Sequence, residues 1–310
     1  MNTQSDALHD SFETRRAAPA VISTTHSMYW SVRRELMENR WILLGQFAVA
    51  ALYLVGFLIS TVHLPAHMRA LAGQSTMRHF DPVATPYDIA AGVMMGVLIL
   101  MSLFYSADAL HGERRDRSIL FWKSLPVSDL TTVLAKASIP LVVLPSLAFA
   151  LTIVMQIIML LASTLVLAAN SMSVASLWRD VAPLTRWANL LYHLFTAHAL
   201  WPFPVFCWLI LVSGWVRRAA LLWAALPVVV IAGVEKLFFH SSSFVILVGN
   251  RLIGGGAPTD YTPEGMLPLG PMTHLTPLRY LSAPGFWIGL LLAAVFLVVA
   301  VRLRRYQGAI

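Results

Sequence analysis

The chain has 310 residues, of which 58% are hydrophobic and only 12% charged, and its mean hydropathy is +0.70. A water-soluble core cannot absorb this much apolar surface, so the composition excludes an ordinary soluble domain and predicts an all-α integral membrane protein. The net charge of +7 is explained by basic loops that meet anionic lipid. No nucleic-acid-binding motif accompanies this charge, so we expect no nucleic acid as a partner.

The N-terminal region divides into two parts. Residues 1–25 are polar and contain no apolar run, which predicts a disordered cytoplasmic tail rather than a secretory signal. In residues 26–40, Tyr29, Val32 and Leu36 form one apolar row beside charged residues. This pattern predicts a helix that lies in the membrane interface, and the alternative is a fraying extension of the first span.

Six apolar runs follow within residues 26–310, which we expect to form a single membrane domain. An apolar helix of about 20 residues rises roughly 30 Å, which is enough to cross the hydrocarbon layer. We therefore predict six transmembrane helices, at approximately 41–62, 89–107, 139–168, 191–212, 219–234 and 286–301. Pro140 and Pro145 predict a kink in the third run, and Pro227 interrupts the short fifth run.

Basic residues predict the orientation, because Lys and Arg gather in cytoplasmic loops. With both termini in the cytoplasm, the cytoplasmic segments contain 15 of the 22 basic residues. The opposite orientation would invert this ratio. We therefore expect a multi-pass protein of a bacterial-type inner (cell) membrane with both ends inside.

A polar, arginine-rich segment separates the second and third runs, ERRDRSILFWKSLPVSDLTTVLAK. Glu113 precedes Arg117 by four residues, a favourable charge order on a helix. Further on, Ser128 can cap a second helix that has Asp129 in its first turn. We call residues 113–128 the insert, and predict that it forms a short cytoplasmic helix at the membrane surface, where a partner protein can push on it.

A long outer segment, residues 237–285, precedes the last run. It begins with SFVILVGNRLI and continues through several glycines and prolines. It is too short to cross the membrane twice, so we predict a re-entrant or interfacial helix followed by an irregular loop. No internal repeat is visible, so carriers built from inverted repeats receive no support.

Motifs for catalysis or metal binding are absent from the sequence. It contains neither a GxxxxGK[ST] phosphate loop nor an HExxH zinc motif. His111 and Glu113 lack a third ligand nearby, and Cys207, the only cysteine, is expected to be a packing residue. His193 and His198 are weak candidates for a substrate path, and the alternative is hydrogen bonding to neighbouring helices. We therefore predict no catalytic residues and no metal site.

Charged residues are almost missing from the interior of the apolar runs. Asp88, Asp108, Glu235 and Lys236 lie near the ends of runs, where water or a partner is within reach. Burying a charge in lipid costs at least a few kcal/mol, so intramembrane charges usually mark ion pathways. Transport driven by protons or sodium is therefore disfavoured, and the energy for any transport should come from another source.

The segment between the second and third runs resembles that of the membrane permease of ABC-2-type transporters. The resemblance rests on Glu113, Ser118, Leu120, the step Leu125-Pro126-Val127-Ser128, and Lys136. The order of an interfacial helix, six spans and an outer segment before the last span also agrees with that family. The chain departs from the pattern at Arg117, where glycine is frequent, and at Asp129, where a basic residue is frequent.

This resemblance implies a permease subunit without enzymatic activity or a bound cofactor of its own. Two copies, or one copy and a related permease, would bind two cytoplasmic ATP-binding cassette ATPase subunits, which would hold ATP and magnesium. The insert would be the coupling helix, and the transporter would export a hydrophobic or amphiphilic substrate. Its predicted contact residues are Glu113, Arg114, Arg117, Phe121, Trp122 and Lys123.

Three alternatives stay open at this point. The insert can be an ordinary basic loop whose aromatic side chains rest on lipid headgroups. The chain can be a membrane-embedded enzyme that uses His193, His198 and loop carboxylates. It can also be a membrane scaffold or sensor that signals to a cytosolic partner without transporting anything.

Overall fold

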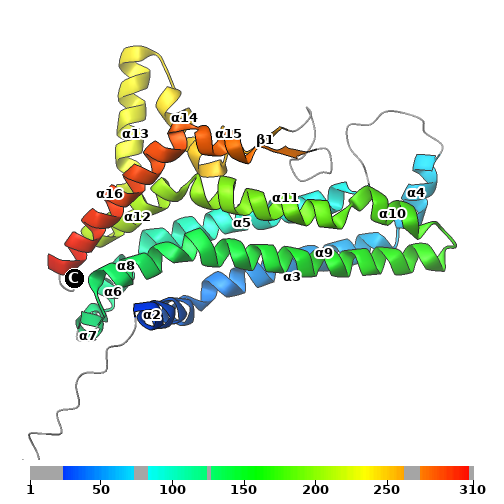
Figure 1. Cartoon of the computed structure of the whole chain (residues 1–310), viewed down its shortest axis with the longest axis horizontal. Helices are drawn as coiled ribbons and strands as arrows, with labels where there is room; N and C mark the ends of the chain where they lie inside the picture. Colours follow the sequence, from blue (N-terminus) through cyan, green and yellow to red (C-terminus); the bar gives the residue numbers. More distant parts are fainter. Residues whose placement is uncertain (1–23, 73–82, 124–126, 262–272, 307–310) are drawn as a thin grey trace, which may run out of the picture.

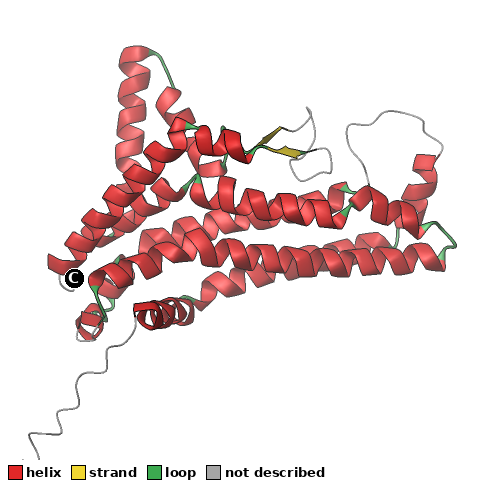
Figure 2. Cartoon of the chain, viewed as in Figure 1, coloured by secondary structure: helices red, strands yellow, loops and turns green. Residues whose placement is uncertain are grey.

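Helices make up 85% of the computed structural model, which describes residues 24–72, 83–123, 127–261 and 273–306 (Figure 2). Within these ranges, five helices are long and apolar enough to cross a membrane, or up to six if one bent pair counts as a single span. The predicted all-α membrane class is therefore confirmed, with five to six spans. The expected N-terminal tail lies outside the described residues, except for its last two positions.

The first two helices, α2 (Thr24–Glu38) and α3 (Arg40–Thr61), meet at Asn39 and run in different directions. Figure 1 shows α2 end-on at one end of the bundle, whereas α3 runs along the bundle. The side chains of Tyr29 and Trp30 are 60% and 48% exposed, while Glu35 is buried. One face of α2 thus exposes aromatic side chains, and the opposite face buries the carboxylate of Glu35.

The centre of the bundle is formed by α3, α5 (Thr85–Asp108) and α9 (Leu144–Ala169), which pack side by side (Figure 1). On α5, buried Ala91, Met94, Leu98 and Tyr105 recur at helical spacing and face this core. Such a stripe buries one face of a helix, and here the opposite face is left for lipid or for other helices. The short helix α4 (Leu64–Ala72) follows α3 at the far end.

The third span is a single 41-residue segment, Asp129–Ala169, made of α8 (Asp129–Ser138), the π-helical turn η1 (Ile139–Val143) and α9. Pro140 lies in η1 and Pro145 lies at the start of α9. Because these prolines lack backbone N–H groups, the helix forms one widened turn at this position. The sequence predicted a kink here. A helix of this length extends about 60 Å, so part of it projects beyond a hydrocarbon layer of roughly 30 Å.

The fourth run is not one straight span. The chain forms α10 (Val174–Val181), α11 (Pro183–Phe195) and η2 (Thr196–Leu200), and α12 (Phe203–Trp215) then leaves at an angle of 42°. The break at Trp201 and Pro202 falls inside the predicted span 191–212, which is corrected accordingly. Pro202 and Pro204 remove two backbone donors within three residues, which explains why the helix does not continue.

The fifth span, α13 (Ala220–Phe239), stays unbroken despite Pro227, and only 6% of its apolar window is buried. It stands away from the main bundle in Figure 1, with α14 (Ser243–Ile253) folding back beside it. The two oxygens of the Glu235 carboxylate accept hydrogen bonds from the backbone N–H groups of Ser243 and Phe244, both at 2.9 Å. Glu235 therefore caps α14 and closes the hairpin.

The last elements return the chain to the insert end of the bundle. Strand β1 (Asp260–Tyr261) pairs antiparallel with β2 (His274–Leu275), and α15 (Pro277–Ser282) leads into α16 (Pro284–Tyr306). Helix α16 packs along α12. Gly289 permits this approach, because a Cβ at this position would lie 3.1 Å from Pro204 and still closer to the Arg251 guanidinium. This packing carries Arg304, near the end of α16, to the insert.

Candidate functional site: the insert

The insert, together with the two residues before it, forms two one-turn helices instead of the single helix predicted over residues 113–128. Helix α6 (His111–Arg115) is followed by α7 (Ile119–Lys123), and Arg117 between them has a left-handed backbone with φ 57°. This conformation is uncommon for a non-glycine residue and ends α6. Glu113 and Arg117 therefore do not share a helical face, and the ion pair expected between them is replaced by contacts with distant elements.

Ser128 caps α8 as predicted. Its side-chain oxygen accepts a hydrogen bond from the backbone N–H of Thr131 at 3.1 Å, and Asp129 lies in the first turn. Residues 124–126, which include Pro126, lie outside the described part of the chain. The cap fixes where the third span begins, directly after the insert.

Loss of this cap should destabilise the protein measurably. We expect Ser128→Ala to lower the free energy of unfolding by about 1 kcal/mol, because one N–H of the first turn of α8 loses its acceptor. A denaturant titration of the solubilised protein measures this change. Ser146→Ala removes an exposed hydroxyl that, within the described residues, bonds to the carbonyl of Val142 one turn earlier in the same span. This control should change the free energy by less than about 0.5 kcal/mol.

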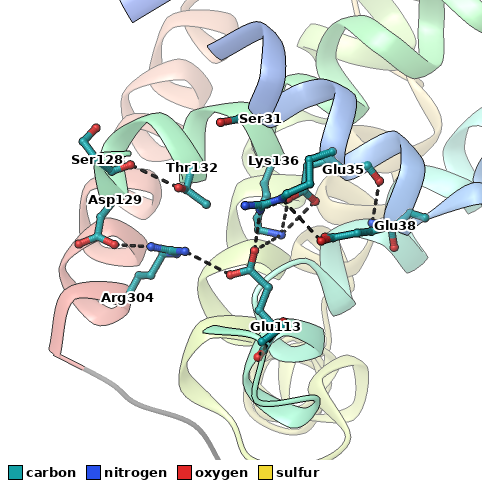
Figure 3. Close-up of polar contacts among 12 residues, drawn as sticks. Ser31, Glu35, Glu38, Glu113, Ser128, Asp129, Thr132, Lys136 and Arg304 are labelled. Atoms are coloured by element: carbon teal, nitrogen blue, oxygen red, sulfur yellow. Dashed lines mark hydrogen bonds and ion pairs between the residues drawn. The ribbon is translucent and has the colours of Figure 1, made fainter. Parts of the chain in front are cut away.

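Glu113 is buried, with basic groups from three other helices around its carboxylate (Figure 3). Its Oε1 lies 2.9 Å from Arg34 Nη2 of α2 and 3.2 Å from Lys136 Nζ of α8. Its Oε2 lies 3.3 Å from Arg304 Nη2 of α16. One carboxylate of the insert is thus shared among α2, the third span and the last span.

Glu35 supplies a second buried carboxylate to the same cluster. Its oxygens lie 2.9 Å from Lys136 Nζ and 2.7 Å from Arg34 Nη2, and Tyr105 donates its hydroxyl hydrogen to Oε2 at 2.9 Å. Burial alone would raise the pKa of Glu35, but the charges of Lys136 and Arg34 outweigh burial and hold this pKa below its ordinary value. Glu35 therefore stays ionised at neutral pH.

Arg304 completes the cluster by also pairing with Asp129 at the start of α8 (Figure 3). We call the six residues Arg34, Glu35, Glu113, Asp129, Lys136 and Arg304 the ion cluster. Its three carboxylates balance its three basic groups. A buried ion cluster gains little net stability over apolar packing, but removal of one member leaves an uncompensated charge at a cost of several kcal/mol. The cluster therefore fixes how α2, α6, α8 and α16 are placed relative to one another.

Arg114 ties the insert to the end of α12. Its Nη1 donates to the carbonyl oxygens of Gly214 at 2.6 Å and of Val216 at 3.3 Å. The backbone N–H of Leu110 donates to Ser213 Oγ at 3.1 Å, and the Leu110 side chain packs against Gly214, where a Cβ would lie 3.0 Å away. Helix α6 is consequently held on two sides, by the ion cluster and by α12.

The outward side of the insert is formed mainly by α7 and its approach. Arg117, Leu120, Phe121 and Lys123 are exposed, with Leu120 at 62% and Phe121 at 61%. The side chain of Trp122 lies outside the described part. Of the six predicted contact residues, Glu113 and Arg114 thus point into the protein, while Arg117, Phe121 and Lys123 are on the surface.

Comparisons with protein-family models, curated proteins and solved structures gave no match. The insert is therefore interpreted from its own geometry, together with the sequence pattern that it carries.

His193 and His198 lie apart from the insert, in α11 and η2. His193 is buried, His198 is half-buried, and the two side chains are close enough to interact electrostatically. The Nδ1 atom of His198 has no hydrogen-bond partner among the described residues. No group of three His, Cys, Asp or Glu side chains in the described ranges is placed to hold a metal ion.

A second buried polar group lies toward the other end of the bundle. Arg186 of α11 pairs with Asp88 of α5, at the position where the sequence anticipated water or a partner for Asp88. Gln156 of α9 donates to the carbonyl oxygen of Tyr87 at 2.9 Å and accepts from Trp187 Nε1 at 2.8 Å. These contacts join α5, α9 and α11 at a distance from the insert.

Sequence reasoning missed four members of the site: Arg34, Glu35, Tyr105 and Arg304. Arg34 and Glu35 are among the charged residues beside the apolar row in residues 26–40, and Arg304 is one of the 15 basic residues counted in the cytoplasmic segments. The available signal was the presence of acidic residues among the many basic residues of the cytoplasmic segments. That signal does not say which charges pair.

Proposed function

We propose that this chain is the membrane subunit of an ATP-driven transporter of the ABC-2 type, in which the insert couples a separate ATPase to the spans. The observation that carries this proposal is the division of the insert into a fixed base and an exposed tip. Its base, α6, is held by buried ions and by α12, whereas α7 presents Leu120 and Phe121 to the outside. In this arrangement, a partner that binds α7 would transmit force to the helices that hold α6.

The contacts of α6 define which spans such a force would reach. A push on α7 reaches α8 and the third span through Lys136, and α16 through Arg304. The same force reaches α2 through Arg34 and α12 through Arg114. Because these ion pairs are short and buried, movement of the base requires the attached helices to move with it.

The proposal places the insert and both termini in the cytoplasm of an inner (cell) membrane, with α2 in the interface. Two copies of the chain, or one copy and a related permease, would assemble with two ATP-binding cassette subunits that hold ATP and magnesium. The aromatic residues exposed on α2 support its interfacial position. The mainly apolar surfaces of the spans favour a hydrophobic or amphiphilic substrate, and the bend of 42° between η2 and α12 supports a substrate path near His198.

Docking of the ATPase should depend on the exposed apolar pair of α7. We expect Leu120→Ala combined with Phe121→Ala to reduce copurification with a coexpressed ATP-binding cassette subunit by at least about tenfold, because truncated apolar anchors typically cost about 1–2 kcal/mol each. The ATPase to test is one encoded by a neighbouring reading frame.

A matched control removes two leucines at the other end of the bundle that are more exposed than Leu120 and Phe121. Leu165 is 71% exposed and Leu184 is 77% exposed. Leu165→Ala combined with Leu184→Ala should leave copurification unchanged within about twofold. Equal copurification of the Leu120/Phe121 variant and the wild type would argue instead for a loop that rests on lipid headgroups.

A further inference from the structure

A concavity of about 550 Å³ lies at the turn that joins α12 to α13, and the proposed function does not use it. It is lined by Trp215, Val216, Arg217, Arg218 and Trp223. Trp215 is the last residue of α12 and Trp223 lies in the first turn of α13. The concavity is therefore at the end of two apolar helices, close to α6.

Two tryptophan rings form the apolar side of this concavity. Their centroids are 6.3 Å apart in an edge-to-face arrangement, and Trp215 and Trp223 are 60% and 49% exposed. The N–H of the Trp208 ring donates to the carbonyl oxygen of Ala224 at 3.2 Å and holds α12 against α13. Exposed tryptophans at the ends of apolar helices are typical of the boundary between membrane and water, where the ring meets the glycerol region.

Two arginines form the polar side. Arg217 and Arg218 are exposed, and neither makes an ion pair with a carboxylate in the described part of the chain. Asp108, at the end of α5, pairs with His111 and Arg115 instead. The charge of Arg114 lies near enough to Arg217 for the two to repel each other. The turn is thus locally positive, and guanidinium groups bind phosphate oxygens in pairs.

We propose that this turn binds the headgroup phosphate of an anionic glycerophospholipid. Arg217 and Arg218 hold the phosphate, and the rings of Trp215 and Trp223 contact the glycerol. The volume of the concavity falls within the range of small-ligand sites. Leu222 beside it is 72% exposed and offers an apolar surface to an acyl chain. The proposal requires only that the turn lies at a membrane surface, so it is independent of the transport function.

The same turn is attached to the insert. Arg114 donates to the carbonyl oxygens of Gly214 and Val216, and a ring nitrogen of His111, Nε2, lies 3.2 Å from the carbonyl oxygen of Arg217. A lipid that orders Arg217 and Arg218 would therefore order the backbone that holds α6. Lipid composition would in this way influence the position of the insert.

The test is a binding titration with fluorescent phosphatidylglycerol and the purified full-length chain in neutral detergent, followed by fluorescence anisotropy. Arg217→Gln combined with Arg218→Gln should weaken binding about 10- to 30-fold, since each basic residue near an anionic headgroup contributes about 1 kcal/mol. Arg302→Gln combined with Arg305→Gln removes two other exposed charges from the last turns of α16. This control should bind within about twofold of the wild type.

Further measurements distinguish a specific lipid site from unspecific attraction of anions to a basic surface. Trp215→Leu combined with Trp223→Leu keeps every charge and should still weaken binding, while phosphatidylcholine should bind weakly to the wild type. Equal losses in the two arginine double variants would overturn the proposal by showing unspecific attraction. Unchanged binding by the tryptophan variant, or complete displacement of the lipid by inorganic phosphate, would also overturn it.

Discussion

Glu113→Gln is expected to lower the free energy of unfolding by about 3–5 kcal/mol, the cost of breaking a buried ion cluster by removing one partner. The substitution keeps the shape of the side chain but leaves Arg34, Lys136 and Arg304 facing one another without the carboxylate that they share. A denaturant titration of the solubilised chain, followed by circular dichroism, measures the change.

The control for this prediction lies in the same insert. Asp116 is exposed and pairs only with its neighbour Arg115 in the described part of the chain. Asp116→Asn removes the same charge and should change the free energy by less than about 0.5 kcal/mol. If both variants lost the same amount of stability, Glu113 would be an ordinary surface carboxylate and the ion cluster would not fix α6.

The second large effect is expected for Lys136→Met, which should lower the free energy of unfolding by about 3–5 kcal/mol at neutral pH. The variant keeps three cluster carboxylates but only two basic groups, Arg34 and Arg304. The buried excess of negative charge then favours uptake of a proton. The difference in unfolding free energy between wild type and variant should therefore shrink on acidification, because a proton on a cluster carboxylate compensates for the missing positive charge of the ammonium group.

The stability of the wild type should change with pH in the opposite direction. The pKa of Glu35 is held below its ordinary value, so its contribution to stability is complete above the pKa of an unfolded glutamate, about 4.3, and is lost as the pH falls through the lower folded value. Acidification thus weakens the wild type while it relieves the variant. Unfolding measured at about pH 7 and again at about pH 3.5, below the pKa of the unfolded glutamate, tests this, and a constant difference between the two proteins would contradict the assigned role of Lys136.

The features predictable from the sequence were those set by local patterns. Uninterrupted apolar length located α3, α5, α9, α13 and α16, because a helix in lipid must satisfy its own backbone hydrogen bonds. Ser128 was recognised as a cap because the chemistry of capping involves only the next turn.

The features that escaped prediction depend on contacts between distant residues. Glu113 and Arg304 are 191 residues apart, and no local spacing indicates that they meet. Pro202 and Pro204 already mark the fourth run as irregular in the sequence, but the bend of 42° was not predicted because hydropathy continues through the break. The predicted pair of Glu113 and Arg117 was wrong because three basic groups from other helices outcompete one neighbour on a short, exposed turn.

The most direct test of the coupling role is a cysteine cross-link from the insert to the ATPase in native membranes. Cys207, the only natural cysteine, is fully buried, so the wild type serves as a blank. Leu120→Cys places a thiol on α7, and Ser173→Cys places one on the exposed turn after α9, at the opposite end of the bundle (Figure 1). We predict that a short thiol-reactive cross-linker joins only the Leu120→Cys chain to the ATP-binding subunit. Cross-linking through Ser173→Cys alone, or labelling of Leu120→Cys in intact cells by a maleimide that cannot cross the membrane, would contradict the account.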